Sequence, residues 1–255
     1  MTSIDIKTAK FKYALRMGDD RLILSHRLSE WCGHGPILEE DIAVTNIGLD
    51  LLGQANELLT YAGEIEGEGR DADRLAHFRI EPQYTNVKLS EIPNGNFADT
   101  IARQFVWDVF DFYFCKALKE SSDEHFAAIA EKSLKEVTYH VRHTSSWVKK
   151  LGDGTEESHQ KMQEAFDNVW MYTGELFEMD EVDKILIENK IAPDLNKIKS
   201  EWEETISSVL SEATIKKPLD QWMQTGARKG QHTESLGRIL ADLQYLPRAF
   251  PNSKW

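Results

Sequence analysis

The feature that most limits what this chain can fold into is the absence of proline between Pro93 and Pro193. This long stretch is rich in Ala, Glu, Lys, Leu and Gln, which all favour the α-helix. A β-sandwich of the same length would need turn residues about every dozen positions, so that class is disfavoured. The sequence therefore predicts an all-α protein.

Apolar periodicity and helix-capping residues predict the positions of the helices. Asn96 and Asp99 have the spacing of a capping box, and Thr233 is a suitable N-cap for the last helix. The segment 38–62 is apolar around most of its circumference, which predicts a central helix. The expected helices span 7–32, 38–62, 97–120, 123–151, 156–177, 181–189, 194–212 and 234–246.

The four long helices predict a bundle over residues 7–152, followed by a helical elaboration over 153–255. The polar, glycine-containing segment 63–96 is expected to be a long crossover connection inside one domain that spans 1–255, because bundles accommodate such connections.

Composition excludes several classes of partner and compartment. Lys and Arg number 30 against 43 Asp and Glu, which gives a formal charge of −13 and argues against nucleic acid or an anionic membrane surface as a partner. Cys32 and Cys115 cannot make a disulfide scaffold, and both are expected to be reduced and buried in helices. No signal peptide or membrane-length apolar run is evident, so a cytoplasmic location is expected.

Helical bundles can hold a carboxylate-bridged di-iron site, which takes two Glu-x-x-His pairs and two further Glu residues. The chain has one such pair, Glu156 and His159, at the polar start of a predicted helix. We interpret Glu156 and Glu157 as first-turn acids that interact with the helix dipole. A single pair cannot hold two iron ions.

Two other helices have partial versions of this pattern. A polar line runs along the predicted helix 38–62, and it is either a hydrogen-bonded seam with close approach at Gly53 or the remnant of a lost ligand pair. The predicted helix 123–151 carries valine three residues before an imidazole, where a bridging carboxylate would be needed. No catalytic, cofactor-binding or working metal residue is assigned, and the candidates for a vestigial site are Asp50, Gly53, Asp108, Val137 and His140.

Two basic pairs stand out in this acidic chain, Lys216-Lys217 and Arg228-Lys229. They are candidates for binding a phosphorylated ligand or an acidic partner, although such pairs are more often simply solvated.

Four segments resemble a known family: LSEWCGH at 28–34, NIGLDLLGQA at 46–55, NGNFADTIARQ at 94–104, and KGQHTE at 229–234 with Leu236 and Gly237. They are similar to the structural subunits, the C components, of the bacterial phenylacetyl-CoA 1,2-epoxidases. The similarity extends from about Lys12 to Trp255.

The resemblance implies a ferritin-like fold and a role in aerobic phenylacetate degradation. It implies that this subunit is not an enzyme by itself and holds no cofactor, and that a homologous catalytic subunit carries the di-iron centre and epoxidises the ring with O2. Electrons would come from a separate flavin and iron-sulfur reductase. Whether the isolated chain forms a homodimer stays open.

Two alternatives to the structural role also stay open. One is an oxidoreductase subunit with its own altered metal site, built from Asp50, Asp108, Glu136 and His140. The other is a module that binds part of the CoA moiety through Arg228 or Lys229.

Overall fold

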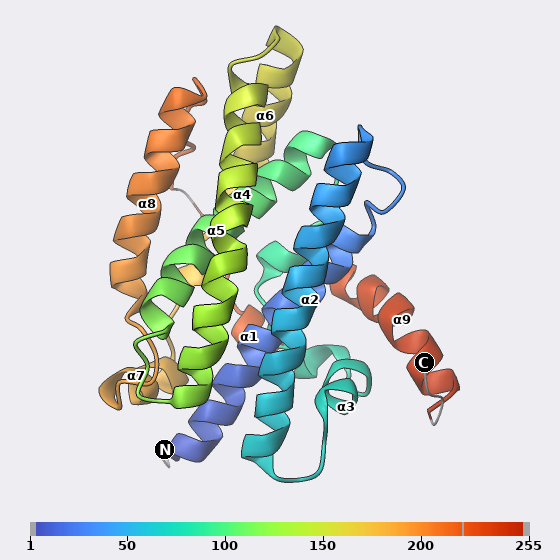
Figure 1. Cartoon of the computed structure of the whole chain (residues 1–255), viewed down its shortest axis with the longest axis vertical. Helices are drawn as coiled ribbons and strands as arrows, with labels where there is room; N and C mark the ends of the chain where they lie inside the picture. The colour runs from blue at the N-terminus through green and yellow to red at the C-terminus, as the bar shows by residue number, and fades with distance from the viewer. Residues whose placement is uncertain (1–3, 221, 252–255) are drawn as a thin grey trace. The chain divides into compact units, whose positions relative to one another are not determined.

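The computed structural model describes residues 4–220 and 222–251, and every regular element within them is a helix (Figure 1). The all-α prediction is therefore confirmed for this part of the chain. The α-helices are α1 (Ile6–Ser29), α2 (Leu38–Glu66), α3 (Ala72–His77), α4 (Phe97–Leu118), α5 (Glu124–Gly152), α6 (Glu156–Val169), α7 (Glu181–Glu188), α8 (Leu195–Glu212) and α9 (Glu234–Ala249). Short 3-10 helices are η1 (Glu81–Gln83), η2 (Lys88–Glu91), η3 (Trp170–Tyr172), η4 (Gly174–Phe177) and η5 (Ala227–Lys229).

Side-chain caps determine where most of the α-helices begin. The predicted capping box at α4 is confirmed, since Asn96 Oδ1 accepts from the Ala98 and Asp99 amides while Asp99 Oδ2 accepts from the Asn96 amide. Thr233 caps α9 as predicted, by accepting from the Ser235 amide at 3.2 Å. These bonds satisfy amide groups that have no partner inside a helix.

The predicted helix 156–177 is wrong in its second half, because α6 ends at Val169 and the chain continues as η3 and η4. Thr173 explains part of this change. Its hydroxyl donates to the Trp170 carbonyl at 2.9 Å, and its amide bonds the same carbonyl at 3.1 Å. Such local bonding tightens the backbone into 3-10 turns.

The described residues form two compact units. The first contains the residues up to Pro93, the segment Glu181–Leu186 and the residues from Gly226 onward, and the second contains the rest. The residues after 152 are therefore shared, with α9 in the first unit and α6 and α8 in the second. The single-domain organisation over 1–255 stays a prediction, and its ends at 1–3 and 252–255 lie outside the described residues.

In the first unit α1 and α2 pack side by side (Figure 1). A Cβ atom on Gly18 would lie 2.8 Å from Leu59 Cγ, so glycine is what permits the close approach here. Every residue of α1 from Tyr13 to Ser25 is buried.

The prediction that the 38–62 helix is central is wrong. α2 exposes Ile42, Leu49 and Leu52, and α1 is the helix that is buried around its circumference. An apolar side chain is compatible with either a core or an interface, and periodicity alone does not distinguish the two.

In the second unit α4 packs against α5, α6 and α8. Its aromatic side chains form the centre of this core, where Phe105 meets Phe166 edge-to-face with ring centroids 6.3 Å apart. Trp202 of α8 donates from Nε1 to the Val106 carbonyl at 2.9 Å, so the indole is both buried and hydrogen-bonded.

The cysteine prediction is half right. Cys115 is buried in α4, but Cys32 is exposed in the turn that follows α1. The predicted helix 7–32 ends earlier than expected, at Ser29, and the chain continues as a turn in which Gly33 takes a φ of 81°. None of the helices that the structure describes is long and apolar enough to cross a bilayer.

Candidate functional site

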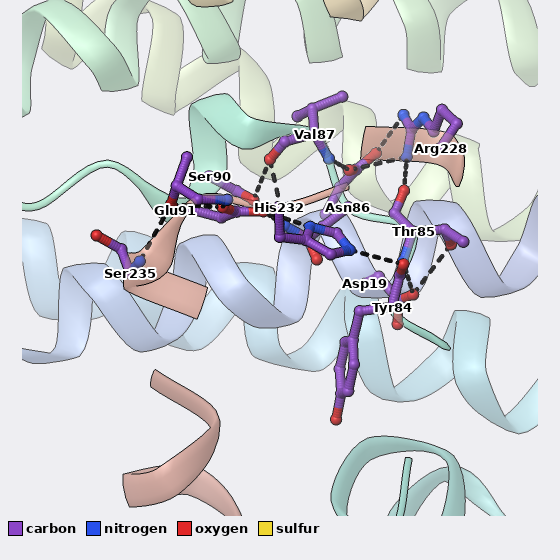
Figure 2. A network of polar contacts seen from close by, with 12 residues as sticks. Asp19, Tyr84, Thr85, Asn86, Val87, Ser90, Glu91, Arg228, His232 and Ser235 are labelled. Atoms are coloured by element: carbon purple, nitrogen blue, oxygen red, sulfur yellow. Dashed lines mark hydrogen bonds and ion pairs between the residues drawn. The ribbon is translucent and has the colours of Figure 1, made fainter. Parts of the chain in front are cut away.

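A buried polar network in the first unit joins three segments that are distant in the chain: α1, residues 79–91 and residues 226–235 (Figure 2). Asp19 of α1 has no exposed surface. Its Oδ2 accepts from the Thr85 amide at 2.9 Å and from the Thr85 hydroxyl at 3.1 Å, and the carboxylate pairs with Arg79. A helix side chain thus supplies the hydrogen bonds that the irregular segment cannot make within itself.

Asp20 performs the same task beside it. Its Oδ1 accepts from the Val87 amide at 2.7 Å, and its two oxygens accept from Arg228 Nη1 at 3.0 Å and Nη2 at 2.8 Å. Arg228 Nη1 also donates to the Thr85 carbonyl at 2.6 Å. This two-point contact is the geometry in which guanidinium and carboxylate interact most strongly.

The third part of the network is built around Glu91, whose carboxylate is also buried. Glu91 Oε2 accepts from the Thr233 amide and hydroxyl, each at 2.7 Å, and Oε1 accepts from Asn86 Nδ2 at 2.9 Å. His232 Nδ1 lies 2.6 Å from Glu91 Oε1, and His232 Nε2 lies 2.9 Å from the Tyr84 carbonyl oxygen. Both neighbours are acceptors, so the arrangement favours the imidazolium form, which donates from both nitrogens.

The surroundings of His232 change its acidity in two opposing directions. Burial of the ring lowers the pKa, but the hydrogen bond and charge of Glu91, together with the Tyr84 carbonyl, raise it more. The pKa of His232 therefore lies above its ordinary value of 6.5. A histidine with a raised folded-state pKa stabilises the fold below pH 6.5 and loses that contribution as the pH rises through the raised value.

The His232→Asn variant is expected to remove this part of the pH dependence. Urea unfolding of the wild type between pH 6 and pH 9 should show a fall in the free energy of unfolding that the variant lacks. His34, which is exposed, provides the control substitution His34→Asn, and this variant should keep the wild-type pH dependence. An identical pH dependence in the wild type and His232→Asn would contradict an imidazolium at this position.

Sequence reasoning singled out Arg228 for another role and assigned none to Asp19, Asp20, Glu91 and His232. One signal was available: Arg16, Asp19, Asp20 and Arg21 point in several directions around α1, whose neighbouring residues are apolar. These charges cover more than half of the circumference of the helix, so they cannot all face water if the helix packs in a core, and they indicate buried ion pairs. The partners themselves were not predictable, because Asp19 and Asp20 reach residues 60 to 208 positions away.

The second unit brings together two of the predicted site residues, Asp108 on α4 and His140 on α5, both buried. Asp108 Oδ1 accepts from Gln104 Nε2 at 2.6 Å, and Oδ2 accepts from the Thr144 hydroxyl at 3.0 Å. Burial raises the pKa of Asp108 to about 7, although the charge of His140 and the two hydrogen bonds lower it. Val137, one turn before His140, is fully buried.

Asp50 and Gly53 belong to the first unit and are not in its core. Asp50 is half-buried and Gly53 is exposed, with no heavy atom within 4 Å of the place a Cβ would take. The close helix approach expected at Gly53 is therefore not made within the described chain.

These residues do not fit a di-iron centre. Val137 offers no donor atom where the pattern requires a bridging carboxylate, and Gly53 offers no side chain at all. No three His, Cys, Asp or Glu side chains come together as a metal ion would need, as far as residues 4–220 and 222–251 show. The Glu156-x-x-His159 pair lies at the surface, where His159 Nδ1 contacts the Gly152 carbonyl oxygen at 2.7 Å. Glu156 and Glu157 lie in the first turn of α6, the position in which acids interact favourably with the helix dipole.

The structure also shows where three residues of the two basic pairs lie. Arg228 is paired with Asp20, which gives this arginine a structural role, and its assignment to a phosphorylated ligand stays a prediction. Lys217 lies over the Trp170 ring at 5.6 Å, and Lys229 is exposed on η5.

Comparisons with known proteins agree with the resemblance. The family model described as phenylacetic acid catabolic protein matches residues 2–255, and this family has a ferritin-like helical fold, which confirms that prediction. The chain is 50% identical over 243 residues to the C component of the 1,2-phenylacetyl-CoA epoxidase of Escherichia coli (strain K12), a match that covers 95% of this chain and 98% of that protein. By sequence and fold, this chain belongs to the phenylacetic acid catabolic protein family.

Proposed function

We propose that this chain is the non-catalytic structural subunit of a phenylacetyl-CoA 1,2-epoxidase complex that acts in the cytoplasm. It supports a homologous catalytic subunit, which holds the di-iron centre and oxidises the aromatic ring, and it holds no cofactor itself. The observation that carries the proposal is the Val137–His140 turn, in which a buried valine stands where the Glu-x-x-His pattern has a bridging carboxylate. The chain is also 50% identical to the C component of an epoxidase.

The buried acids of the chain have structural explanations that support this role. Asp19, Asp20 and Glu91 bind backbone amides of irregular segments and the guanidinium and imidazole groups described above. Asp108 is bonded to Gln104 and Thr144. A core that uses its carboxylates to order loops is suited to a rigid scaffold, because satisfied polar networks hold one arrangement of the backbone.

The first test is metal content together with co-purification. The chain produced alone should contain far less than one iron per molecule by elemental analysis. When it is produced with the catalytic subunit, the two should purify together and the iron should follow the catalytic subunit. A tight content of two iron ions in the chain alone would contradict the proposal.

One observation favours the oxidoreductase alternative, namely the proximity of the Asp108 carboxyl group and the His140 imidazole. The variant His140→Gln separates the two functions. A structural subunit should leave kcat of the reconstituted complex unchanged within about twofold, whereas a metal ligand would cost about 10-fold or more. His34 in the exposed turn after α1 provides the matched control, as His34→Gln.

A further inference from the structure

One face of α2 is apolar and exposed. Its large side chains are Leu38, Ile42, Leu49 and Leu52, which are 72%, 51%, 58% and 45% exposed. They are separated by four, seven and three residues, and at about 100° per residue they fall within about 40° of one line along the helix. We call these four residues the α2 stripe; it is about 21 Å long at a rise of about 1.5 Å per residue.

The other side of α2 already has its partner within the chain. Val44, Ile47, Leu51 and Leu58 are buried, and the helix packs on α1. The stripe is therefore a second apolar face on the same helix, not a continuation of the core. Several large aliphatic side chains in one exposed line are typical of a surface that is covered in an assembly.

The charge of α2 indicates what covers it. The helix contains no Lys or Arg, and its charged residues are all acidic: Glu39, Glu40, Asp41, Asp50, Glu57, Glu64 and Glu66. Glu39, Asp50 and Glu57 lie with Asn46 and Gly53 along one edge of the stripe, at about 60° to 120° from its line. The polar line noticed in the sequence is thus the acidic border of an exposed apolar surface.

This charge distribution argues against a second copy of the chain as the occupant. A two-fold axis perpendicular to the helices would place the edge with Glu39 against the same edge of the other copy. A two-fold axis parallel to the helices would place it against the edge with Asp41 and Glu66. In the first arrangement acid would face acid, which is unfavourable at an interface. In the second, the acids would face Asp41, which accepts from the Gly35 amide, and Glu66, which is paired with Arg70, so no net positive charge would meet them.

We propose that the α2 stripe docks an amphipathic helix of the catalytic subunit, one whose apolar seam is bordered by Lys and Arg side chains. The inference rests on the proposed function and adds to it the face that meets the partner. Apolar contact along the stripe excludes water, and the basic borders pair with the acidic edges of α2. Exposed Gly53, beside Leu49 and Leu52, leaves room for the partner backbone to come close.

The test measures binding of the purified full-length chain to the purified catalytic subunit. Ile42→Glu and Leu49→Glu keep good helix formers in α2 but bring charge into the stripe, and each should raise Kd at least about 30-fold. Leu246→Glu is the matched control, because Leu246 is a leucine of α9 with 49% exposure outside the stripe, and it should bind as the wild type does. Leu49→Ala adds no charge and should raise Kd about 10-fold. This variant keeps the proposal testable even when a Glu variant does not fold.

The dependence of binding on ionic strength tests whether basic side chains of the partner helix face the acidic edges of α2. Raising the salt concentration from about 50 to about 500 mM should weaken wild-type binding several-fold, because the facing charges are screened. Binding that does not depend on salt would overturn the charged part of the proposal.

The possible failures are distinguishable. If the wild type does not bind the catalytic subunit, the proposed function is overturned together with this inference. If the wild type binds and the stripe variants bind equally well, only the inference is overturned. A wild-type homodimer that Leu49→Glu dissociates, seen by sedimentation while binding to the catalytic subunit persists, would assign the stripe to a second copy and also overturn it.

Discussion

The variant Asp108→Asn is expected to be more stable than the wild type at pH 8, although it removes a buried acid with two hydrogen bonds. Burial raises the pKa of Asp108 from an ordinary 3.8 to about 7. An acid whose pKa is higher in the folded than in the unfolded state destabilises the fold increasingly as the pH rises from the unfolded-state pKa to the folded-state pKa. For Asp108 the difference between the two pKa values corresponds to roughly 4 kcal/mol above pH 7. Asparagine is not subject to that cost.

The hydrogen bonds of Asp108 can be kept by the amide. The asparagine oxygen would accept from Gln104, and its Nδ2 would donate to the Thr144 hydroxyl oxygen. The Thr144 hydroxyl has two acceptors within reach, Asp108 Oδ2 and the His140 carbonyl oxygen at 2.9 Å, and in the variant its single proton would go to the carbonyl. The gain in stability should therefore reach up to roughly 4 kcal/mol at pH 8 and fall to less than about half of that at pH 5.

Urea unfolding at the two pH values measures this difference. Asp242→Asn on the exposed side of α9 is the control and should change the free energy of unfolding by less than about 0.5 kcal/mol at both. Loss of stability in Asp108→Asn at pH 8 would show instead that the surroundings of Asp108, His140 among them, stabilise its ionised carboxylate by more than burial destabilises it.

Arg228→Ala is expected to have the opposite effect and to destabilise the chain by about 3–5 kcal/mol, because it leaves the buried Asp20 carboxylate without its cation. The adjacent Lys229→Ala removes an exposed charge of the same sign and should change stability by less than about 0.5 kcal/mol. Thermal or urea unfolding of the two variants measures the contrast.

This pair of variants also tests the idea that the chain binds part of the CoA moiety. A binding role for Arg228 predicts weaker substrate affinity in a normally stable protein. A structural role predicts loss of stability, and the complex should keep its substrate affinity under conditions in which the variant remains folded. Weaker affinity with unchanged stability would support the binding role.

The helical character of the chain was predictable because it depends on local chemistry. Proline is absent where the long helices run, and side chains at Asn96, Asp99 and Thr233 cap helices near their own positions in sequence. Helix ends were less certain where local bonds compete, as at Thr173, whose hydroxyl and amide both bond the Trp170 carbonyl.

The candidate metal positions were partly predictable for the same reason. The spacing of Val137 and His140 is a property of one helix, so the sequence alone shows that a carboxylate is missing. That His140 lies near Asp108, and that this acid is buried deeply enough to raise its pKa to about 7, depends on how α4 and α5 pack.

The sequence by itself determined where the long helices run, although it missed the short helix α3 and extended α6 too far; it also determined that the acidic chain has no second Glu-x-x-His pair and which family it resembles. Only the tertiary structure decided which apolar and charged residues are buried. It placed charged Asp19 and Asp20 inside and left Leu49 outside, the reverse of what side-chain polarity alone suggests. The physical reason is that burial of a charge depends on a partner such as Arg79 or Arg228, and the distance along the chain to that partner carries no local signal.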